Sequence, residues 1–436
     1  MLTRTVLAWL LLTAVPAFAD VLIVDATGSG DFTDLQPAVD AAADGDTILV
    51  RTGTYLGFAV SQKSLTVVAE PGAAVDVARS VRVRKLTAGQ TVVVIGLRVR
   101  GKAQGPNIRP GAVLLDDQGA VRFEECVLIG VDKGPFFASN PAGVGAHLEA
   151  AQDVVFSNCT IRGGQLIGCC APSFCSCLTC GYDQFMGPNP RGGGILATTS
   201  RLAVFDTLSF GGHGEHDVAL DASSGGDAAT LIDSELFVQG SLLAGGDGGD
   251  SAGISTATGG NGGAGLALSG PLGSTATLVE VTLTGGTAGE GSPGLVQCVH
   301  GCSGADLVIQ AGSQSLALPG LARSLDLTAT ATEGTAHPLT FEGEPGDEVF
   351  LFISPTAKLE APHPLFVGQL ALGLPLLRRL KMGTIDASGQ LVASVPVPAV
   401  PDGEAQNLYV QPLFVDLLGT AVLGTPRTLV VLDSNP

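Results

Sequence analysis

The sequence predicts an all-β protein, a stacked solenoid of short strands followed by a small β-sandwich. Three observations predict this fold. A phrase of alternating apolar residues that ends in glycine recurs six times, glycine supplies 61 of the 436 residues, and proline, leucine and valine dominate after Gly320. A repeat of a few tens of residues is typical of stacked architectures, in which each unit buries its apolar face against its neighbours.

The first segment has the features of a secretory signal peptide. Arg4 precedes an apolar run over residues 6–15, and Ala17-Phe18-Ala19 forms an Ala-x-Ala end. The run is shorter than the roughly 20 apolar residues that a transmembrane helix needs. We therefore predict that residues 1–19 are a signal peptide, and that the mature protein is secreted to the extracellular space or cell surface without a membrane span.

A short amphipathic helix is predicted next. Thr33 is the expected N-cap, and Gly45 is expected to end the helix before a strand at Thr47–Val50. The apolar positions share one face of such a helix; they are Leu35, Ala38, Val39 and Ala42. Because the first coil of a solenoid needs a cover, this helix is expected to be an N-terminal cap.

The repeat itself is predicted to have two halves. One half is a glycine-led strand such as Gly111–Leu115, and the other is the recurring phrase, first seen at Val92–Gly101. Strands of successive coils should stack about 4.8 Å apart. The glycine-rich stretches between them are expected to be surface loops; they lie at 164–192, 247–262 and 286–293. The repeat is predicted to span residues 20–320.

The last part of the chain, residues 321–436, is predicted to be a separate β-sandwich. Turn sequences at Glu344–Asp347 and Asp386–Gly389 separate runs of alternating apolar residues. The predicted strands are Glu348–Ile353, Leu391–Val397, Leu408–Leu417 and Arg427–Leu432. A length near 100 residues is ordinary for a domain.

The net charge excludes some partners. The formal charge is −19 at pH 7, which argues against nucleic acid or an anionic membrane as a ligand. It suits a solvated extracellular protein, a cation-binding surface or a basic partner. The oligomeric state is left open.

Residues 25–68 carry a family resemblance. The residues concerned are Gly28-Ser29-Gly30-Asp31-Phe32-Thr33, Leu35-Gln36, Ala38-Val39, Gly45-Asp46, Gly53-Thr54-Tyr55 and Leu65-Thr66-Val67. The segment resembles the opening of the pectin methylesterases and of the wider pectin-lyase-like superfamily. The resemblance implies a right-handed parallel β-helix over residues 20–320. The C-terminal part resembles the modules that follow many secreted bacterial repeat proteins.

The catalytic residues of these families are not matched. Where a methylesterase has its Gln-Asp pair, this chain has Asp132 and Lys133, and the second aspartate position holds Ala146. Gly212-His213-Gly214 resembles a polygalacturonase motif, but that family's other motifs are missing. We therefore predict a non-catalytic protein that binds glycan or cell-surface matrix. The alternative is a polysaccharide lyase or glycoside hydrolase with its site in a groove of the β-helix, for which Asp132 and Lys133 are the candidate catalytic residues.

Two short segments are candidate metal sites. One gathers imidazole and carboxylate ligands: His213, Glu215, His216 and Asp217. The other, Gly245–Asp250, matches six positions of a calcium-binding nonapeptide, with Asp247 and Asp250 as ligands. The alternatives are a solvated polar turn for the first segment and a flexible loop for the second. No cofactor other than calcium is suggested.

Nine cysteines in a secreted chain predict disulfide bonds. Cys126 and Cys159 occupy the same position in consecutive coils, so they should stack, either as a disulfide or as two reduced thiols in the interior. Cys298 and Cys302 flank one turn and are a second candidate pair. The other candidates crowd one loop: Cys169, Cys170, Cys175, Cys177 and Cys180.

Overall fold

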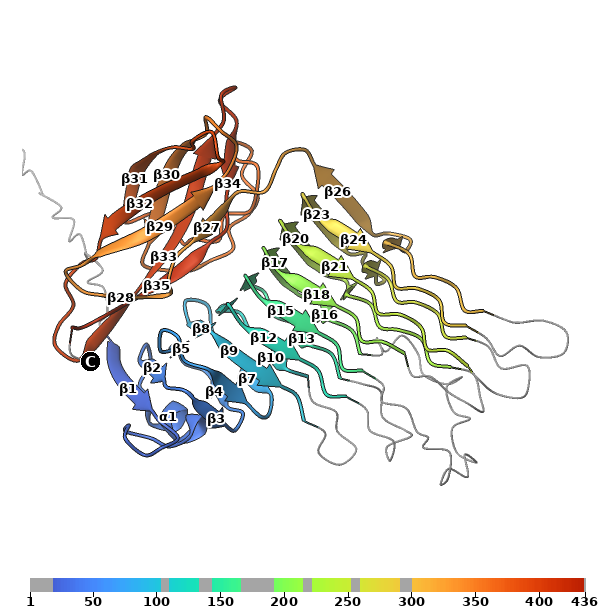
Figure 1. Ribbon diagram of the computed structural model, residues 1–436, viewed down its shortest axis with the longest axis horizontal. Coiled ribbons are helices and arrows are strands. Elements are labelled where there is room, and N and C mark those ends of the chain that lie inside the picture. Colours follow the sequence, from blue (N-terminus) through green and yellow to red (C-terminus); the bar gives the residue numbers. More distant parts are fainter. Residues whose placement is uncertain are drawn as a thin grey trace, which may run out of the picture.

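The computed structural model describes residues 19–102, 110–132, 143–165, 192–214, 222–251, 259–290 and 300–434. Over these residues the protein is nearly all β-structure, with one helix (Figure 1). The expected all-β class is therefore confirmed. A repeat region of parallel strands, residues 19–318, leads into a C-terminal region, residues 319–434.

The repeat region contains three parallel sheets. From Thr47 onward strands recur in sets of three, called rungs below, and each strand pairs with the strand three places along. The first sheet contains β2 Thr47–Val50, β5 Leu65–Ala69, β8 Thr91–Ile95, β11 Ala120–Glu124, β14 Val154–Ser157, β17 Arg201–Phe205, β20 Glu235–Gln239, β23 Thr275–Val279 and β26 Gln314–Leu318.

The second and third sheets complete each rung. The second contains β3 Gly53–Tyr55, β6 Val75–Val77, β9 Leu97–Arg100, β12 Val127–Ile129, β15 Thr160–Arg162, β18 Leu208–Phe210, β21 Leu242–Ala244 and β24 Thr282–Thr284. The third contains β4 Ala59–Ser61, β7 Val81–Arg84, β10 Ala112–Leu115, β13 Ala146–Glu149, β16 Ile195–Thr198, β19 Ala229–Ile232, β22 Leu266–Ser269 and β25 Leu307–Ile309.

Each rung has three strands because the recurring phrase bends in its middle. The prediction of two halves was wrong on this point. From β8 onward one or two residues separate the first-sheet strand from the second-sheet strand, and the first of them has positive φ. These residues, called the corner row, are Gly96, Glu125, Asn158, Asp206, Gly240 and Glu280. A left-handed residue turns the chain sharply without extra loop residues. Two residues of the corner row, Asp206 and Glu280, line the candidate site described below.

Apolar side chains fill the space enclosed by the three sheets. Alternate residues of each strand point inward and form one continuous buried cluster from Val24 to Leu278. Identical positions repeat from rung to rung, so Phe123 stacks on Phe156 with ring centroids 5.5 Å apart. Burial of this kind contributes roughly 25 cal/mol per Å² of apolar surface, and it is the main force that holds the rungs together.

The N-terminal end of the stack is covered by α1 (Leu35–Ala41). Asp34, rather than the predicted Thr33, is the N-cap, because its carboxylate accepts a hydrogen bond from Leu35 N at 2.9 Å. The helix ends at Ala41, before Gly45. Strand β1 (Ala19–Val24) pairs in parallel with β2. The predicted signal-peptide cleavage stays a prediction, because residues 1–18 lie outside the described residues.

Glycine-rich segments extend the second and third sheets as stacked legs (Figure 1). After the later second-sheet strands the chain runs out along one segment, such as Gly245–Ser251, and returns along another, such as Gly259–Gly265. These segments are called legs below. Gly246 N donates to Gly226 O, and Gly263 N to Gly246 O, each at 2.8 Å. A Cβ on Gly263 would lie 2.0 Å from Gly226 O. The described parts of these stretches are therefore hydrogen-bonded layers, and the flexibility expected at Gly245–Asp250 stays a prediction.

The C-terminal region contains two sheets that share an apolar cluster. One sheet contains β27 Ser324–Asp326, β29 Ala336–Glu342 and β32 Gln390–Pro396. The other contains β28 Thr330–Thr332, β30 Glu348–Ser354, β31 Arg378–Thr384, β33 Glu404–Val415, β34 Ala421–Leu423 and β35 Arg427–Leu432. The predicted strands β30, β32, β33 and β35 are confirmed within a few residues. Strand β33 also pairs with β1, which joins this sheet to the first sheet of the repeat region.

Candidate functional site

The outer face of the first sheet is occupied by the C-terminal region. Phe205 and Phe237 pack there against Leu359 and Ala371. Asp153 accepts a hydrogen bond from Leu359 N at 2.9 Å and pairs with Arg122 at 2.7 Å. This face is therefore an internal contact, and a ligand must bind elsewhere.

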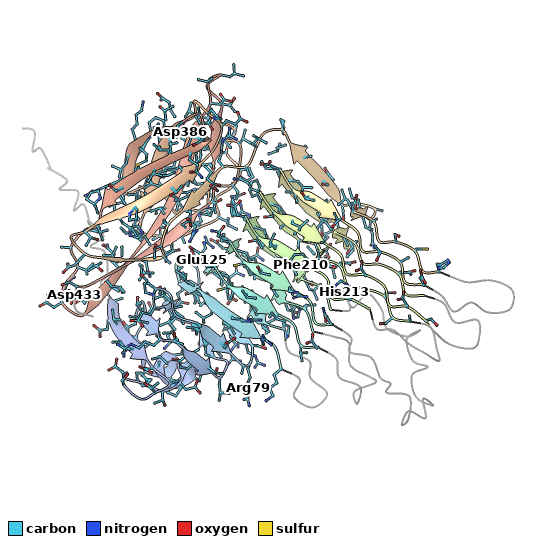
Figure 2. All side chains as sticks on the ribbon, in the orientation of Figure 1. Arg79, Glu125, Phe210, His213, Asp386 and Asp433 are labelled. Carbon is cyan, nitrogen blue, oxygen red and sulfur yellow. The ribbon has the colours of Figure 1, made fainter. Side chains whose placement is uncertain are left out.

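A buried charge network fixes this contact. Arg427 is fully buried, and its Nε lies 3.4 Å from Glu124 Oε2. Glu124 also accepts a hydrogen bond from Thr428 N at 2.9 Å. Burial raises the pKa of Glu124, while Arg427 and Thr428 act in the opposite direction. Arg427 also pairs with Glu125 of the corner row, which Figure 2 shows at the boundary between the two regions.

A cleft of about 640 Å³ lies beside this contact, between the second sheet and the C-terminal region. Its side on the repeat region includes Asp206 and Glu280 of the corner row, with Leu208, Leu242 and Thr282 from the second sheet. The opposite side includes Glu342, Ser388 and Gln390. The cleft therefore combines an apolar floor with carboxylate and amide groups, a combination typical of small-ligand sites.

Each cleft carboxylate already has a partner in the protein. The Thr425 hydroxyl donates to Asp206, Ala322 N donates to Glu280 at 2.5 Å, and Gln390 Nε2 donates to Glu342 at 3.1 Å. Burial raises the pKa of Asp206 to about 6, and the charges of Glu342 and Glu280 act in the same direction. None of the described residues that line the cleft is lysine or arginine.

The outer face of the second sheet continues from the cleft across the earlier rungs. Its outward side chains form rows across the strands, because parallel pairing keeps equivalent residues in register. One row contains Arg100, Ile129, Arg162 and Phe210, and Figure 2 shows Phe210 where β18 gives way to its outgoing leg. Arg98, Arg100 and Arg162 are exposed, as is Leu208 with 43% of its surface accessible.

The predicted catalytic pair is only partly placed. Asp132 follows strand β12, and its Oδ1 accepts a hydrogen bond from Gln165 N at 2.8 Å. This contact links two adjacent legs. Lys133 lies outside the described residues, so the pairing of these two residues stays a prediction. Ala146, at the expected place of the second esterase aspartate, is buried in the interior.

The predicted metal ligands that the structure describes join neighbouring legs. His213 Nδ1 lies 3.2 Å from Asp247 Oδ2, and Asp247 Oδ1 accepts from Thr287 N at 2.7 Å. The Thr287 amide lowers the pKa of Asp247. Asp250 makes the same contact with Glu290 N at 2.7 Å. These carboxylates satisfy amides of the next leg.

No group of three or more His, Cys, Asp or Glu side chains in the described part of the chain is placed to hold a metal ion. The remaining candidates of the first segment, Glu215, His216 and Asp217, lie outside the described residues. Calcium binding therefore has no support from the positions of Asp247 and Asp250.

The two stacked cysteines are buried free thiols. Cys159 Sγ donates to Phe123 O at 3.3 Å, and Cys126 Sγ donates to Val94 O at 3.4 Å. Burial raises the pKa of the Cys159 thiol. Of the two alternatives that the sequence left open, the structure has the reduced pair. Cys302 is an exposed free thiol, and its candidate partner Cys298 lies outside the described residues. So do the five crowded cysteines, Cys169, Cys170, Cys175, Cys177 and Cys180.

The sequence did not predict the cleft or the row that contains Arg100 and Arg162, called the arginine row. Asp206 and Glu280 lie at the bend inside the phrase, where each directly follows a first-sheet strand, but their partners are more than 40 positions away in the sequence. The arginine row did leave a signal. Residues 77–102 contain seven lysines and arginines and no acidic residue, in a chain of net charge −19.

The sequence and the structure were compared with those of known proteins. No protein-family model and no curated protein matches the sequence. Among solved structures, a superoxide reductase (neelaredoxin) from Ignicoccus hospitalis is 8% identical, with 26% of this chain and 80% of that chain covered and a TM-score of 0.16. A TM-score this low carries no inference about fold or activity. Within the described ranges, no helix is long and apolar enough to cross a membrane.

Proposed function

We propose that this chain is a secreted right-handed parallel β-helix with a C-terminal β-sandwich, and that it binds glycan or cell-surface matrix without catalysing a reaction. The binding surface is the outer face of the second sheet together with the cleft. The observation that carries the proposal is this face itself, an array of exposed and half-exposed side chains in register over successive rungs.

The spacing of the array suits an extended polysaccharide. Outward side chains repeat about every 4.8 Å along the stack, a distance comparable to the length of one sugar unit. Leu208, Phe210 and Leu242 offer apolar contacts for the faces of sugar rings, and Thr160 and Thr282 offer hydroxyls. Apolar surface with a few polar groups is what ligand sites in proteins generally provide.

The contacts of the carboxylates favour binding over catalysis. Hydrolysis of a glycosidic bond requires two carboxyl groups that both face the scissile bond. Here the Glu280 carboxylate accepts a hydrogen bond from Ala322 N of the C-terminal region, and the Glu342 carboxylate accepts one from Gln390 within that region. Asp132 is likewise bonded to Gln165 N.

A binding experiment with a matched control tests the proposal. Calorimetric titration of neutral and acidic soluble polysaccharides should reveal a ligand, while an assay for reducing ends should detect no cleavage. The double variant Leu208→Ser/Phe210→Ser should lose at least about tenfold in affinity, because each side chain contributes apolar contact area. The control Val113→Ser/Leu196→Ser changes equivalent outward positions of the third sheet. Equal loss in both variants, or no binding by any polysaccharide, contradicts the proposal.

One observation favours the alternative of a polysaccharide-active enzyme. Asp206 has a pKa raised to about 6 and stands in the cleft with Glu280 and Glu342 nearby. A carboxyl that is still partly protonated near pH 6 is suited to act as a general acid. If reducing ends are released, Asp206→Asn should abolish the reaction and leave binding intact. Asp132→Asn is the matched test of the other candidate, and an unchanged rate in both variants excludes these two carboxyls.

A further inference from the structure

The arginines of the second sheet form an isolated cationic surface on an acidic protein. Arg98 and Arg100 point outward from β9, and Arg162 points outward from β15 two rungs further along. The pairing of β12 with both strands puts Ile129 between Arg100 and Arg162 in one row. Phe210 is the next member of that row.

These guanidinium groups have almost no counter-charge within the described residues. Arg98 approaches Asp76 at 3.9 Å, with about half of each side chain exposed, a geometry that contributes little to stability. Arg100 and Arg162 make no ion pair with any described residue. By contrast, Arg122, Arg323 and Arg427 are all buried against carboxylates. Uncompensated positive charge grouped on one open face is the electrostatic complement of an anionic ligand.

The spacing of side chains along the row indicates how charged and neutral units alternate in that ligand. Arg100 and Arg162 are two rungs apart, which corresponds to about 10 Å at about 4.8 Å per strand. The position between them is the aliphatic Ile129, and the position after Arg162 is the aromatic Phe210. A chain that follows this row therefore meets a cation and an apolar contact alternately, at intervals comparable to one sugar unit.

We propose that this row binds an acidic polysaccharide in which a carboxylate-bearing sugar alternates with a neutral sugar. Each carboxylate accepts paired hydrogen bonds from one guanidinium, the planar geometry in which arginine recognises a carboxylate. The neutral sugars pack on Ile129 and Phe210. A polymer with a carboxylate on every sugar would place unpaired charges over these two side chains, which costs desolvation energy without an ion pair. This inference rests on the proposed glycan-binding function and specifies its ligand.

Titration of the full chain with three polymers of matched length tests the inference. The probes are hyaluronan, in which glucuronate alternates with a neutral amino sugar, polygalacturonate, with a carboxylate on every sugar, and a neutral glucan. The wild-type protein should bind hyaluronan at least tenfold more tightly than either other polymer. Arg100→Gln/Arg162→Gln should lose at least tenfold in affinity for hyaluronan, and its affinity should depend less steeply on salt concentration.

The matched control is Arg84→Gln/Lys85→Gln, which removes the same charge from the exposed end of β7 in the third sheet. It should retain wild-type affinity, because the effect belongs to the row and not to net charge. Tightest binding to polygalacturonate, or an equal loss in the control, overturns the inference. Binding to the neutral glucan that neither variant changes also overturns it, although glycan binding itself then stands. Binding to none of the polymers contradicts both this inference and the proposed function.

Discussion

The outer faces of the first and second sheets are built from the same repeat, but their charged side chains are buried and paired on the first sheet and exposed on the second. On the first sheet, Arg122 is buried beneath the C-terminal region and paired with Asp153, and Glu124 is paired with the buried Arg427 of β35. On the second sheet, Arg100 and Arg162 project from equivalent parallel strands into solvent. The difference arises from the corner row, which turns the chain away from the C-terminal region after each first-sheet strand. The outer face of the first sheet, called the closed face below, is therefore a structural contact, and that of the second sheet, called the open face, is exposed.

The largest expected effect is the loss of the buried arginine of the closed face. Arg427→Met leaves the buried carboxylate of Glu124 without its cationic partner, so we expect about 3–5 kcal/mol of destabilisation. Glu124→Gln in the same background should recover part of the loss, because it removes the uncompensated charge. Urea unfolding of the full chain measures both values.

Substitution of an arginine on the open face should cost much less stability than Arg427→Met. Arg98→Gln breaks an ion pair with Asp76 in which both side chains are about half exposed. It should cost less than about 1 kcal/mol. If the two arginine substitutions prove equally destabilising, the distinction between a structural face and an open face is wrong.

The glycine legs extend away from the closed face. A substitution that disrupts their packing should therefore not destabilise the closed face. Gly263→Ala places a Cβ 2.0 Å from Gly226 O. Overpacking typically costs about 1–3 kcal/mol, and here the obstacle is backbone that cannot rotate away. Hydrogen exchange should accelerate at Gly246 and Gly286, which neighbour this leg, and remain slow in β33 and β35.

The control for this variant is Thr284→Ala, at the exposed end of β24 where a neighbouring leg begins. It adds no atoms between layers, so exchange at the glycine amides should stay near the wild-type rate. Uniform acceleration throughout the molecule in Gly263→Ala would mean that the legs and the closed face unfold together, contrary to the separation described above.

The sequence revealed the repeated elements better than their contacts. The alternating phrase predicted parallel strands, and local signals predicted α1 and the strand Arg427–Leu432. The bend at Glu125 or Asp206 escaped because a single left-handed residue leaves no characteristic sequence. The cleft escaped because Asp206 and Glu342 are brought together by docking of distant segments, which no local pattern encodes.

Asp206 lies where the closed and open faces meet, and it should make stability depend on pH. Burial raises its pKa to about 6 in the folded protein, above the value of about 3.9 for an unfolded aspartate. Folding therefore favours the neutral carboxyl. This contribution is fully present below about pH 4 and is lost as the pH rises through about 6.

Asp206→Asn should consequently increase the free energy of unfolding by on the order of 1 kcal/mol at pH 8, and change it little at pH 4. Urea unfolding at the two pH values measures the difference. The control is Thr282→Ser, a change at a cleft residue that does not titrate, which should alter stability equally at the two pH values. A larger gain at pH 4 than at pH 8 would contradict the placement of Asp206 in a desolvating cleft.

The smallest effect on stability is expected at Asp247. This prediction distinguishes a structural role of the Asp247 carboxylate from a role as a calcium ligand. Its carboxylate accepts hydrogen bonds from Thr287 N and Oγ1, each at 2.7 Å. Asp247→Ala should cost about 0.5–1 kcal/mol, the net contribution of such bonds. Asp247→Asn keeps an acceptor oxygen and should cost less. Because binding to the folded state alone raises stability, a calcium site would make the unfolding temperature rise with calcium and fall with chelator. We expect neither change in the wild-type protein, since the carboxylate holds an amide of the next leg.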